Sequence, residues 1–123
     1  MQPAFRTGVD IIELARIEAA VVRWGDRFLW RIYTPGELAY CRGRISSLAG
    51  RWAAKEAISK ALGTGWSRGI RWVDLEVVRA PGGPPQVRLH GQAQGRAEAL
   101  GIHHWALSLS HSKAYAVAFV VAW

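Results

Sequence analysis

Arg51-Trp-Ala-Ala-Lys-Glu-Ala-Ile-Ser-Lys-Ala-Leu-Gly-Thr-Gly65 is the stretch that decides the fold we predict for this chain. Its alanine-rich, apolar composition predicts a helix, and Gly63 and Gly65 predict where that helix ends. Glu56 and Lys60 are four residues apart, so their side chains project from the same face of the predicted helix. A carboxylate, an ammonium group and a glycine loop at one place suit a site that holds a metal ion beside a phosphate.

An exposed ion pair is the alternative interpretation of Glu56 and Lys60, and such a pair contributes only about 0.3 kcal/mol. Two observations weaken this alternative. The neighbouring residues are small alanines rather than the mixed charges of a solvated face, and the helix leads directly into Gly63-Thr64-Gly65. The backbone of such a glycine loop can approach a ligand closely. A single Gly-Thr-Gly is nevertheless a weak signal, and the chain has no Walker-type phosphate loop.

Apolar periodicity predicts further strands and helices on both sides of this helix. In chain order the elements are a strand at 5–12, a helix at 13–24, a short helical or extended piece at 28–32, a helix from 35 to about 41, the long helix from 46 or 47 to 62, a strand at 70–79, a short strand at 87–89, a helix at 92–100, and strands at 105–110 and 115–122. The order β-α-α-α-β-β-α-β-β predicts an α+β fold with a largely antiparallel sheet packed with helices. We expect residues 1–123 to form a single domain.

Some of these predictions depend on particular residues. Thr34 and Glu37 have the spacing of a capping box at the start of a helix, with a proline at the first helical position. Trp24 continues the apolar stripe of the helix at 13–24, so we expect it to face inward. The final strand at 115–122 is nearly all apolar, so we expect it to be buried.

Composition limits the classes of protein that this chain can belong to. Hydrophobic residues make up 50% of the 123 residues, which excludes a disordered chain. The net charge of +7 favours an acidic partner, such as nucleic acid, an anionic membrane, a phosphorylated ligand or an acidic protein. Cys41 is the only cysteine, so a disulfide within the chain and a cysteine-based zinc site are both excluded. We find no secretory signal and no membrane-spanning run, and we expect a cytoplasmic protein without a membrane partner.

Two further residues are candidates for chemistry, and each has a plainer interpretation. Asp10 ends an apolar strand, where it either caps the following helix or binds a metal ion. His111 lies between the last two strands, where a histidine is more often a surface residue than a catalytic one.

Arg16 and Arg23 share a helix face, with Arg27 just beyond it. This face is either simply solvated or a docking surface for an acidic helical partner.

Six segments, in one order and over nearly the whole chain, resemble the holo-[acyl-carrier-protein] synthase family, the small 4′-phosphopantetheinyl transferases. They are Gly8-Val-Asp-Ile-Ile-Glu-Leu-Ala-Arg-Ile17, Phe28 through Thr34 to Glu37-Leu38, Arg51 to Gly65, Trp72-Val-Asp-Leu-Glu-Val77, Gly83-Pro-Pro-Gln-Val-Arg-Leu-His-Gly91 and Leu107-Ser-Leu-Ser-His-Ser-Lys-Ala-Tyr-Ala-Val-Ala118. The block from Lys55 to Gly65 is the most specific of them. The chain departs from the family in a shorter segment between Tyr40 and Arg51, and in Trp52 where phenylalanine is more usual.

The resemblance implies transfer of phosphopantetheine from coenzyme A to a serine hydroxyl of apo acyl carrier protein, which releases 3′,5′-ADP. It implies a Mg²⁺ ion bound by Asp10 and Glu56, with Lys60 as a third catalytic residue that meets phosphate charge. It places these residues in the coenzyme A pocket: Arg51, Lys60, Gly63, Thr64, Gly65, Ser110 and His111. The carrier protein's acidic helix would dock on Arg16, Arg23 and Arg27. The family is typically a homotrimer with its active sites between neighbouring subunits.

Elementary chemistry agrees with this assignment. Mg²⁺ prefers oxygen ligands, usually one or two carboxylates together with phosphates and waters. The serine nucleophile belongs to the carrier protein, so the enzyme needs no nucleophile of its own. Candidates for accepting the serine proton are a water at the metal ion, or Asp10 or Glu56 acting through such a water.

Two questions of biological role stay open at this point. The carrier protein belongs either to fatty acid biosynthesis, which the family favours, or to a polyketide-type pathway. The competing class is a basic, non-catalytic nucleic-acid-binding module. We disfavour it because the sequence contains no zinc finger, RNA-recognition motif or basic base-reading helix.

Overall fold

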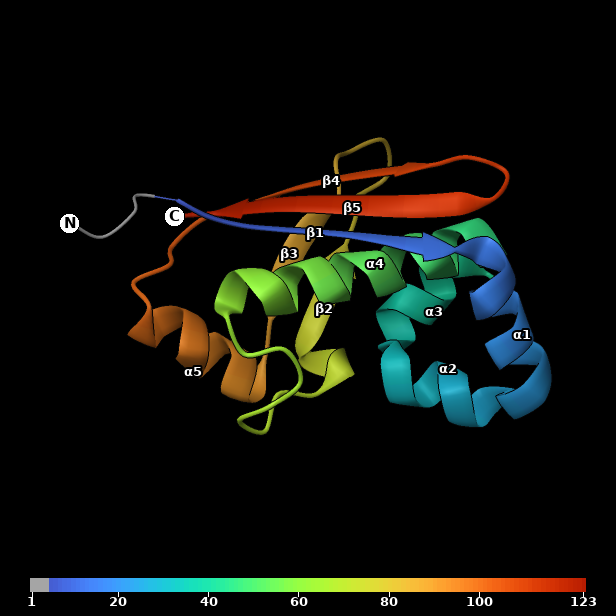
Figure 1. The fold of residues 1–123 in the computed structure, drawn as a ribbon, viewed down its shortest axis with the longest axis horizontal. Helices are drawn as coiled ribbons and strands as arrows, with labels where there is room; N and C mark the ends of the chain where they lie inside the picture. Colours follow the sequence, from blue (N-terminus) through green and yellow to red (C-terminus); the bar gives the residue numbers. More distant parts are fainter. Residues whose placement is uncertain (1–4) are drawn as a thin grey trace.

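The computed structural model describes residues 5–123, which fold into helices packed on small antiparallel sheets (Figure 1). The elements are β1 (Arg6–Glu13), α1 (Leu14–Trp24), α2 (Asp26–Ile32), α3 (Pro35–Cys41), α4 (Ile45–Leu62), a 3₁₀ turn η1 (Trp72–Asp74), β2 (Leu75–Val78), β3 (Gln86–Leu89), α5 (Gly91–Ala99), β4 (Trp105–His111) and β5 (Tyr115–Ala122). The predicted α+β class and the antiparallel pairing are confirmed. The short piece before residue 33 is the helix α2.

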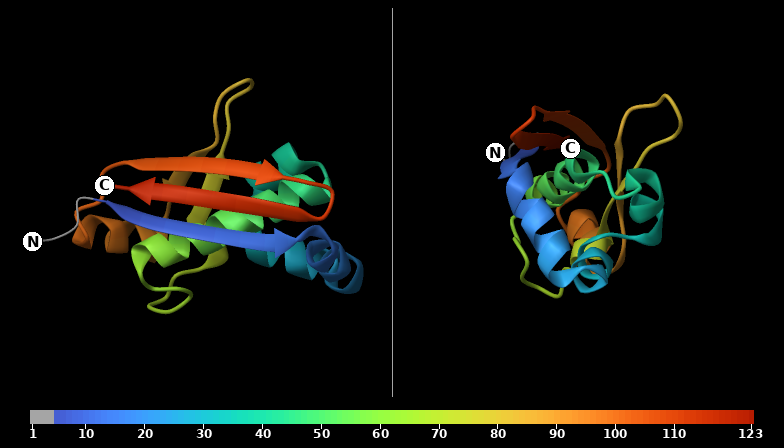
Figure 2. Two further views of the ribbon diagram at one scale, coloured as in Figure 1. Left: turned by 45° about the horizontal axis from the view of Figure 1, so that its top comes forward. Right: turned by 90° about the vertical axis from the view of Figure 1, so that its right-hand side faces the viewer.

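Two antiparallel sheets form the framework around α4. One has the order β1-β5-β4, and the other pairs β2 with β3. The helices lie on one face of the three-stranded sheet, as the end-on view in Figure 2 shows. The helix α4 runs along this inner face and also contacts α1, α3, α5 and β2. A helix surrounded in this way is accessible to solvent only along a narrow stripe that includes Lys60, which explains why its sequence is alanine-rich and apolar rather than broadly amphipathic.

The approach of β1 to α4 is unusually close because Gly8 has no side chain. A Cβ atom at position 8 would overlap the carbonyl oxygen of Ala57, and both partners of that clash would be backbone or Cβ atoms. Any larger residue would therefore push the strand away from the helix. Since Asp10 follows Gly8 by two residues, it lies on the same face of β1 and is held against α4.

The capping box predicted at the start of α3 is confirmed. The hydroxyl of Thr34 accepts a hydrogen bond from the backbone N–H of Glu37 at 3.1 Å, and the Glu37 carboxylate accepts one from the N–H of Thr34 at 2.9 Å. Pro35 occupies the first helical position. Local sequence chemistry was sufficient here because every partner lies within three residues.

The strand predicted at 70–79 is wrong in its first half, because residues 72–74 form the 3₁₀ turn η1 and only Leu75–Val78 pair as β2. Asp74 is the cause. Its carboxylate accepts a hydrogen bond from the backbone N–H of Arg71 at 3.0 Å and pairs with the Arg71 guanidinium at 2.9 Å. These contacts close a turn where the alternating pattern alone predicted an extended chain.

The prediction that the last strand is buried is also wrong on one face. Ala116, Ala118 and Val120 face α4 and are buried, whereas Tyr115 and Phe119 on the opposite face are 48% and 45% exposed. Within residues 5–123 the sheet has helices on one side only, so no helix covers the apolar side chains of β5 on its other side. Periodicity could not reveal this, because both faces of β5 are apolar.

Candidate active site

Asp10 and Lys60 meet where β1 crosses α4, although fifty residues separate them in sequence. The Nζ atom of Lys60 donates a hydrogen bond to Oδ1 of Asp10 at 3.2 Å and a second to the carbonyl oxygen of Val9 at 2.8 Å. The Asp10 side chain is 16% exposed and that of Lys60 is 53% exposed. The interpretation of Asp10 as a helix cap is wrong, since Asp10 lies inside β1 and α1 begins only after Glu13.

Glu56 lies on α4 one turn before Lys60, and the exposed Glu56–Lys60 ion pair is not what forms. Lys60 pairs with Asp10, whereas Oε1 of Glu56 accepts a hydrogen bond from the indole N–H of Trp66 at 3.3 Å. The pKa of the Glu56 carboxyl is raised above its ordinary value, mainly by burial and also by the nearby charge of Asp10. The hydrogen bond from Trp66 and the charge of Lys60 oppose this rise. Among residues 5–123, the site therefore contains two neighbouring carboxylates, of which Asp10 alone is ion-paired.

These two carboxylates fit a divalent cation. Oδ2 of Asp10 is buried and has no hydrogen-bond partner within residues 5–123. A buried carboxylate oxygen without a partner is costly, and a bound cation removes that cost. Both side chains offer hard carboxylate oxygens. Mg²⁺ is commonly bound by one or two carboxylates, and phosphates and waters complete its coordination. The described part of the chain contains no group of three or more His, Cys, Asp or Glu side chains placed to hold a metal ion.

The Gly63-Thr64-Gly65 loop ends α4 in a left-handed turn at Gly63, whose φ is +74°. The backbone N–H of Gly63 donates to the carbonyl of Lys60, and those of Thr64 and Gly65 donate to that of Ser59. These three N–H groups therefore complete the helix end. Two guanidinium groups lie next to the loop, because Arg6 donates to the Ala61 carbonyl at 2.7 Å and Arg96 to the Leu62 carbonyl at 3.1 Å. Neither guanidinium was predicted here, because neither arginine lies near the loop in sequence.

The remaining coenzyme-pocket residues predicted from the sequence do not gather around Asp10 within one chain. Ser110 pairs with Val117 on the exposed face of the sheet, whereas Asp10 lies on the opposite, inner face. His111 is the exposed last residue of β4. Arg51 is buried, and its guanidinium lies over the ring of Tyr40 at 4.1 Å. The roles of these three residues in coenzyme binding stay predictions.

A family model of the 4′-phosphopantetheinyl transferase superfamily matches residues 6–120 of the chain. The holo-[acyl-carrier-protein] synthase of Herpetosiphon aurantiacus is 52% identical over 121 residues, which cover 94% of this chain and 95% of that protein. The chain belongs to the 4′-phosphopantetheinyl transferase superfamily. Its resemblance to the holo-[acyl-carrier-protein] synthases, predicted from the sequence, is confirmed, and the chain is a transferase of this kind.

Solved structures of other holo-[acyl-carrier-protein] synthases share the fold. The enzyme of Helicobacter pylori, solved in complex with coenzyme A, is 34% identical with a TM-score of 0.85, and the match covers 94% of this chain and 98% of that one. The enzyme of Neisseria meningitidis is 34% identical with a TM-score of 0.86, covering 95% and 96% of the two chains. The phosphopantetheinyl transferase fold predicted for this chain is therefore confirmed.

The arginines predicted to dock the carrier protein are exposed on α1 and α2 of this transferase. Trp24 lies between two of them, with the guanidinium of Arg23 at 4.8 Å and that of Arg27 at 5.9 Å from its ring. The prediction that Trp24 faces inward is wrong, because its side chain is 48% exposed. Stacking against two cations holds the indole at the surface, where it adds an apolar centre to the basic face.

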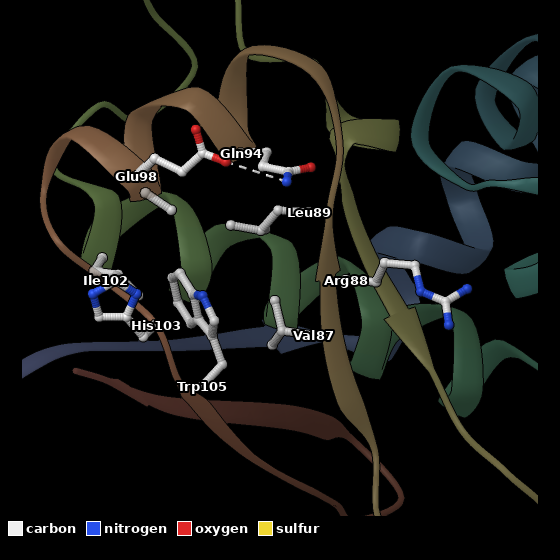
Figure 3. Close-up of a pocket in the computed structure, with 9 residues that line it drawn as sticks. Val87, Arg88, Leu89, Gln94, Glu98, Ile102, His103 and Trp105 are labelled. Atoms are coloured by element: carbon white, nitrogen blue, oxygen red, sulfur yellow. Dashed lines mark hydrogen bonds between the residues drawn. The ribbon is translucent and has the colours of Figure 1, made fainter.

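A pocket of about 480 Å³ lies elsewhere on the transferase, between β3, α5 and β4 (Figure 3). Apolar side chains of Val87, Leu89 and Trp105 line it, and Gln94, also in the lining, donates a hydrogen bond to Glu98. None of the residues predicted to bind metal, coenzyme or carrier protein lines it. Within residues 5–123, no helix combines the length and apolar character that crossing a membrane requires.

Proposed function

We propose that this chain transfers 4′-phosphopantetheine from coenzyme A to a serine hydroxyl of an apo acyl carrier protein in a Mg²⁺-dependent reaction. We further propose that it acts in the cytoplasm and supports fatty acid biosynthesis, with a polyketide-type carrier protein as the alternative partner. The observation that carries the proposal is the meeting of Asp10, Glu56 and Lys60 where β1 crosses α4. The unpartnered buried oxygen of Asp10 supports the metal ion, and the relatives' names support the substrates.

Each residue of the site has a defined task in this reaction. Asp10 and Glu56 would hold the Mg²⁺ ion, which when bound neutralises the charge of the coenzyme A pyrophosphate. Lys60 brings a half-exposed ammonium group to the same place, fixed by its hydrogen bonds to Asp10 and the Val9 carbonyl. The serine hydroxyl gives up its proton, for which Asp10 or Glu56 acting through a water are the candidate acceptors, as its oxygen forms a bond to the phosphorus next to the pantetheine arm. The bond from that phosphorus to the bridging oxygen breaks. The leaving group is 3′,5′-ADP, and the site stabilises the charge that develops on it.

The release of 3′,5′-ADP, measured by chromatography, tests this reaction directly. With coenzyme A, Mg²⁺ and apo acyl carrier protein, we expect 3′,5′-ADP to accumulate in equal amount to the holo carrier protein formed. A carrier protein whose acceptor serine is alanine should give none. Release that proceeds equally well with the alanine variant would mean hydrolysis of coenzyme A rather than transfer, and would refute the proposal.

The uncovered face of the three-stranded sheet supports a homotrimer with active sites between subunits. Val9 and Ile11 of β1 are 54% and 62% exposed there, beside the exposed Tyr115 and Phe119 of β5. An apolar face of this kind is typical of a subunit contact. Ser110 lies on the same face and His111 at its end, so a neighbouring chain seated there could bring its own Asp10 and Glu56 to them.

Light scattering and subunit mixing test this arrangement. We expect the mass of three chains in solution. We also expect two inactive variants, Asp10→Asn and His111→Ala, to regain activity when they are refolded together, because mixed trimers contain some sites with neither substitution. A monomeric mass, or mixtures that stay as inactive as their parents, would contradict the proposal that sites form between subunits.

The basic face of α1 and α2 is proposed to dock the acidic helix of the carrier protein. Arg16→Glu reverses one charge on that face and leaves the proposed metal ligands unaltered, so it should raise the KM for carrier protein by about tenfold and leave the KM for coenzyme A unchanged. Steady-state kinetics with each substrate varied in turn measure the two values. Arg79→Glu, an equal charge reversal on the β2–β3 hairpin, is the matched control. Equal increases in both KM values for Arg16→Glu would count against a docking face.

A further inference from the structure

Three tryptophans from separate parts of the chain stack together next to Glu56. Trp52 belongs to α4, Trp72 to η1 and Trp66 to the loop that follows Gly65. The rings of Trp66 and Trp72 are 3.7 Å apart between centroids at an angle of 21°, and those of Trp52 and Trp72 are 5.2 Å apart at 30°. No spacing in the sequence predicts that these three rings meet.

The stack aims one polar atom at the candidate metal site. The indole N–H of Trp66 donates its hydrogen bond to Oε1 of Glu56, and Trp52 lies one turn before Glu56 on the same helix. Aromatic stacking holds the plane of the Trp66 ring, so its N–H can point only within that plane. The ring therefore does not swing out of the stack to follow Glu56, and the hydrogen bond favours one orientation of the Glu56 carboxylate.

The backbone on both sides of the stack is also held in place. The N–H groups of Thr64 and Gly65 bond to the carbonyl of Ser59, and the hydroxyl of Ser67 donates to the Thr64 carbonyl at 2.6 Å. On the other side, the buried ammonium group of Lys55 donates to the carbonyl of Trp72 at 3.0 Å. The hydrogen bond to Glu56 thus comes from a donor that both the loop and α4 keep in position.

We propose that Trp66 is a positioning residue that holds the Glu56 carboxylate in the orientation that binds the divalent cation. The inference rests on the proposed function, because it assumes that Asp10 and Glu56 bind a cation. Two neighbouring carboxylates repel each other, and an unrestrained Glu56 would lower this repulsion by turning away from Asp10. A hydrogen bond to Oε1 opposes that rotation and leaves Oε2 for the cation. Outer partners of this kind typically change metal affinity by about 10- to 100-fold.

Trp66→Phe and Trp72→Phe form the matched pair that tests this role. Both replace an indole of the same stack by a smaller aromatic ring, but only the first removes the donor to Glu56. The cation affinity is measured by titrating the protein, without substrates, with Mn²⁺ and recording the electron paramagnetic resonance signal of the Mn²⁺ that stays free. We expect Trp66→Phe to weaken Mn²⁺ binding by about tenfold and Trp72→Phe to weaken it less than twofold. Equal affinities for the two variants would overturn the proposal.

A second measurement does not depend on how well Trp66→Phe folds. The seven indole N–H resonances of ¹⁵N-labelled wild-type protein are assigned by triple-resonance spectroscopy. The Trp66 resonance should move when Glu56→Gln removes the charged acceptor, and in the wild type Mn²⁺ should broaden it before the other six. A Trp66 resonance unaffected by both changes would overturn the proposal. Neither measurement requires turnover, so an absence of phosphopantetheine transfer would refute the proposed function alone.

Discussion

Asp10→Asn and Glu56→Gln are each expected to lower the rate of phosphopantetheine transfer by about 10³-fold, because each removes one of two charges that hold the cation. Both changes preserve shape. An asparagine oxygen at position 10 can still accept the hydrogen bond from Lys60, and a glutamine oxygen at position 56 can still accept that from Trp66. The loss should therefore appear in catalysis rather than folding. Transfer rates at saturating coenzyme A and carrier protein, measured over a range of Mg²⁺ concentrations, give the comparison.

Glu13→Gln is the matched control for these variants. Glu13 is an exposed carboxylate at the end of the same strand as Asp10, so its neutralisation changes the net charge equally without touching the site. We expect its rate to stay within twofold of the wild type. The thermal midpoints of all three variants should lie close to that of the wild type. A rate for Asp10→Asn or Glu56→Gln within threefold of the wild type would remove that residue from the proposed metal site.

Lys55→Met is expected to lower the free energy of unfolding by about 3–5 kcal/mol, because it leaves the buried charge of Glu37 without its partner. The two side chains are fully buried and their charged atoms are 2.8 Å apart. The three donors of Lys55 are all used, since its Nζ also bonds to the carbonyls of Trp72 and Leu75. The second oxygen of Glu37 accepts the backbone N–H of Val77. This one ion pair therefore joins α3, α4, η1 and β2.

Urea unfolding of Lys55→Met, Glu37→Gln and the double variant measures the contribution of the pair. The double variant should be markedly less destabilised than the sum of the two single changes, since neither buried charge is then left alone. Lys113→Met alters an exposed lysine in the turn between β4 and β5, and should change stability by no more than about 0.5 kcal/mol. A loss below about 1 kcal/mol for Lys55→Met would show that the buried pair is not what holds these elements together.

How far the sequence predicts this structure depends on how local the deciding contacts are. The capping box of Thr34 and Glu37 was predictable because its partners are three residues apart. The second role of Glu37, as the partner of Lys55, was not, because it depends on how α3 packs against α4. The wrong half of the strand at 70–79 has a local cause, the side chain of Asp74 binding Arg71, which outweighed the alternating pattern.

The contacts of the candidate site likewise include local ones that the sequence predicts and long-range ones that depend on packing. Spacing alone placed Glu56 and Lys60 on one helix face, but the contact of Lys60 with Asp10 depends on the close approach of β1 to α4 at Gly8. No spacing rule connects Trp66 to Glu56, because the shape of the glycine loop between them does not follow from its sequence. The family resemblance implies roles for Ser110 and His111, but these two residues do not gather around Asp10 within a single chain.

The intact mass of an apo acyl carrier protein, measured after incubation with this chain, coenzyme A and Mg²⁺, tests the central claim most directly. We expect a gain of one phosphopantetheine group, its absence when EDTA is present, and its return when Mg²⁺ is added in excess over EDTA. An unchanged mass with several carrier proteins, from a chain shown to be folded, would contradict the proposed transfer. A full gain in EDTA would contradict the role given to Asp10 and Glu56.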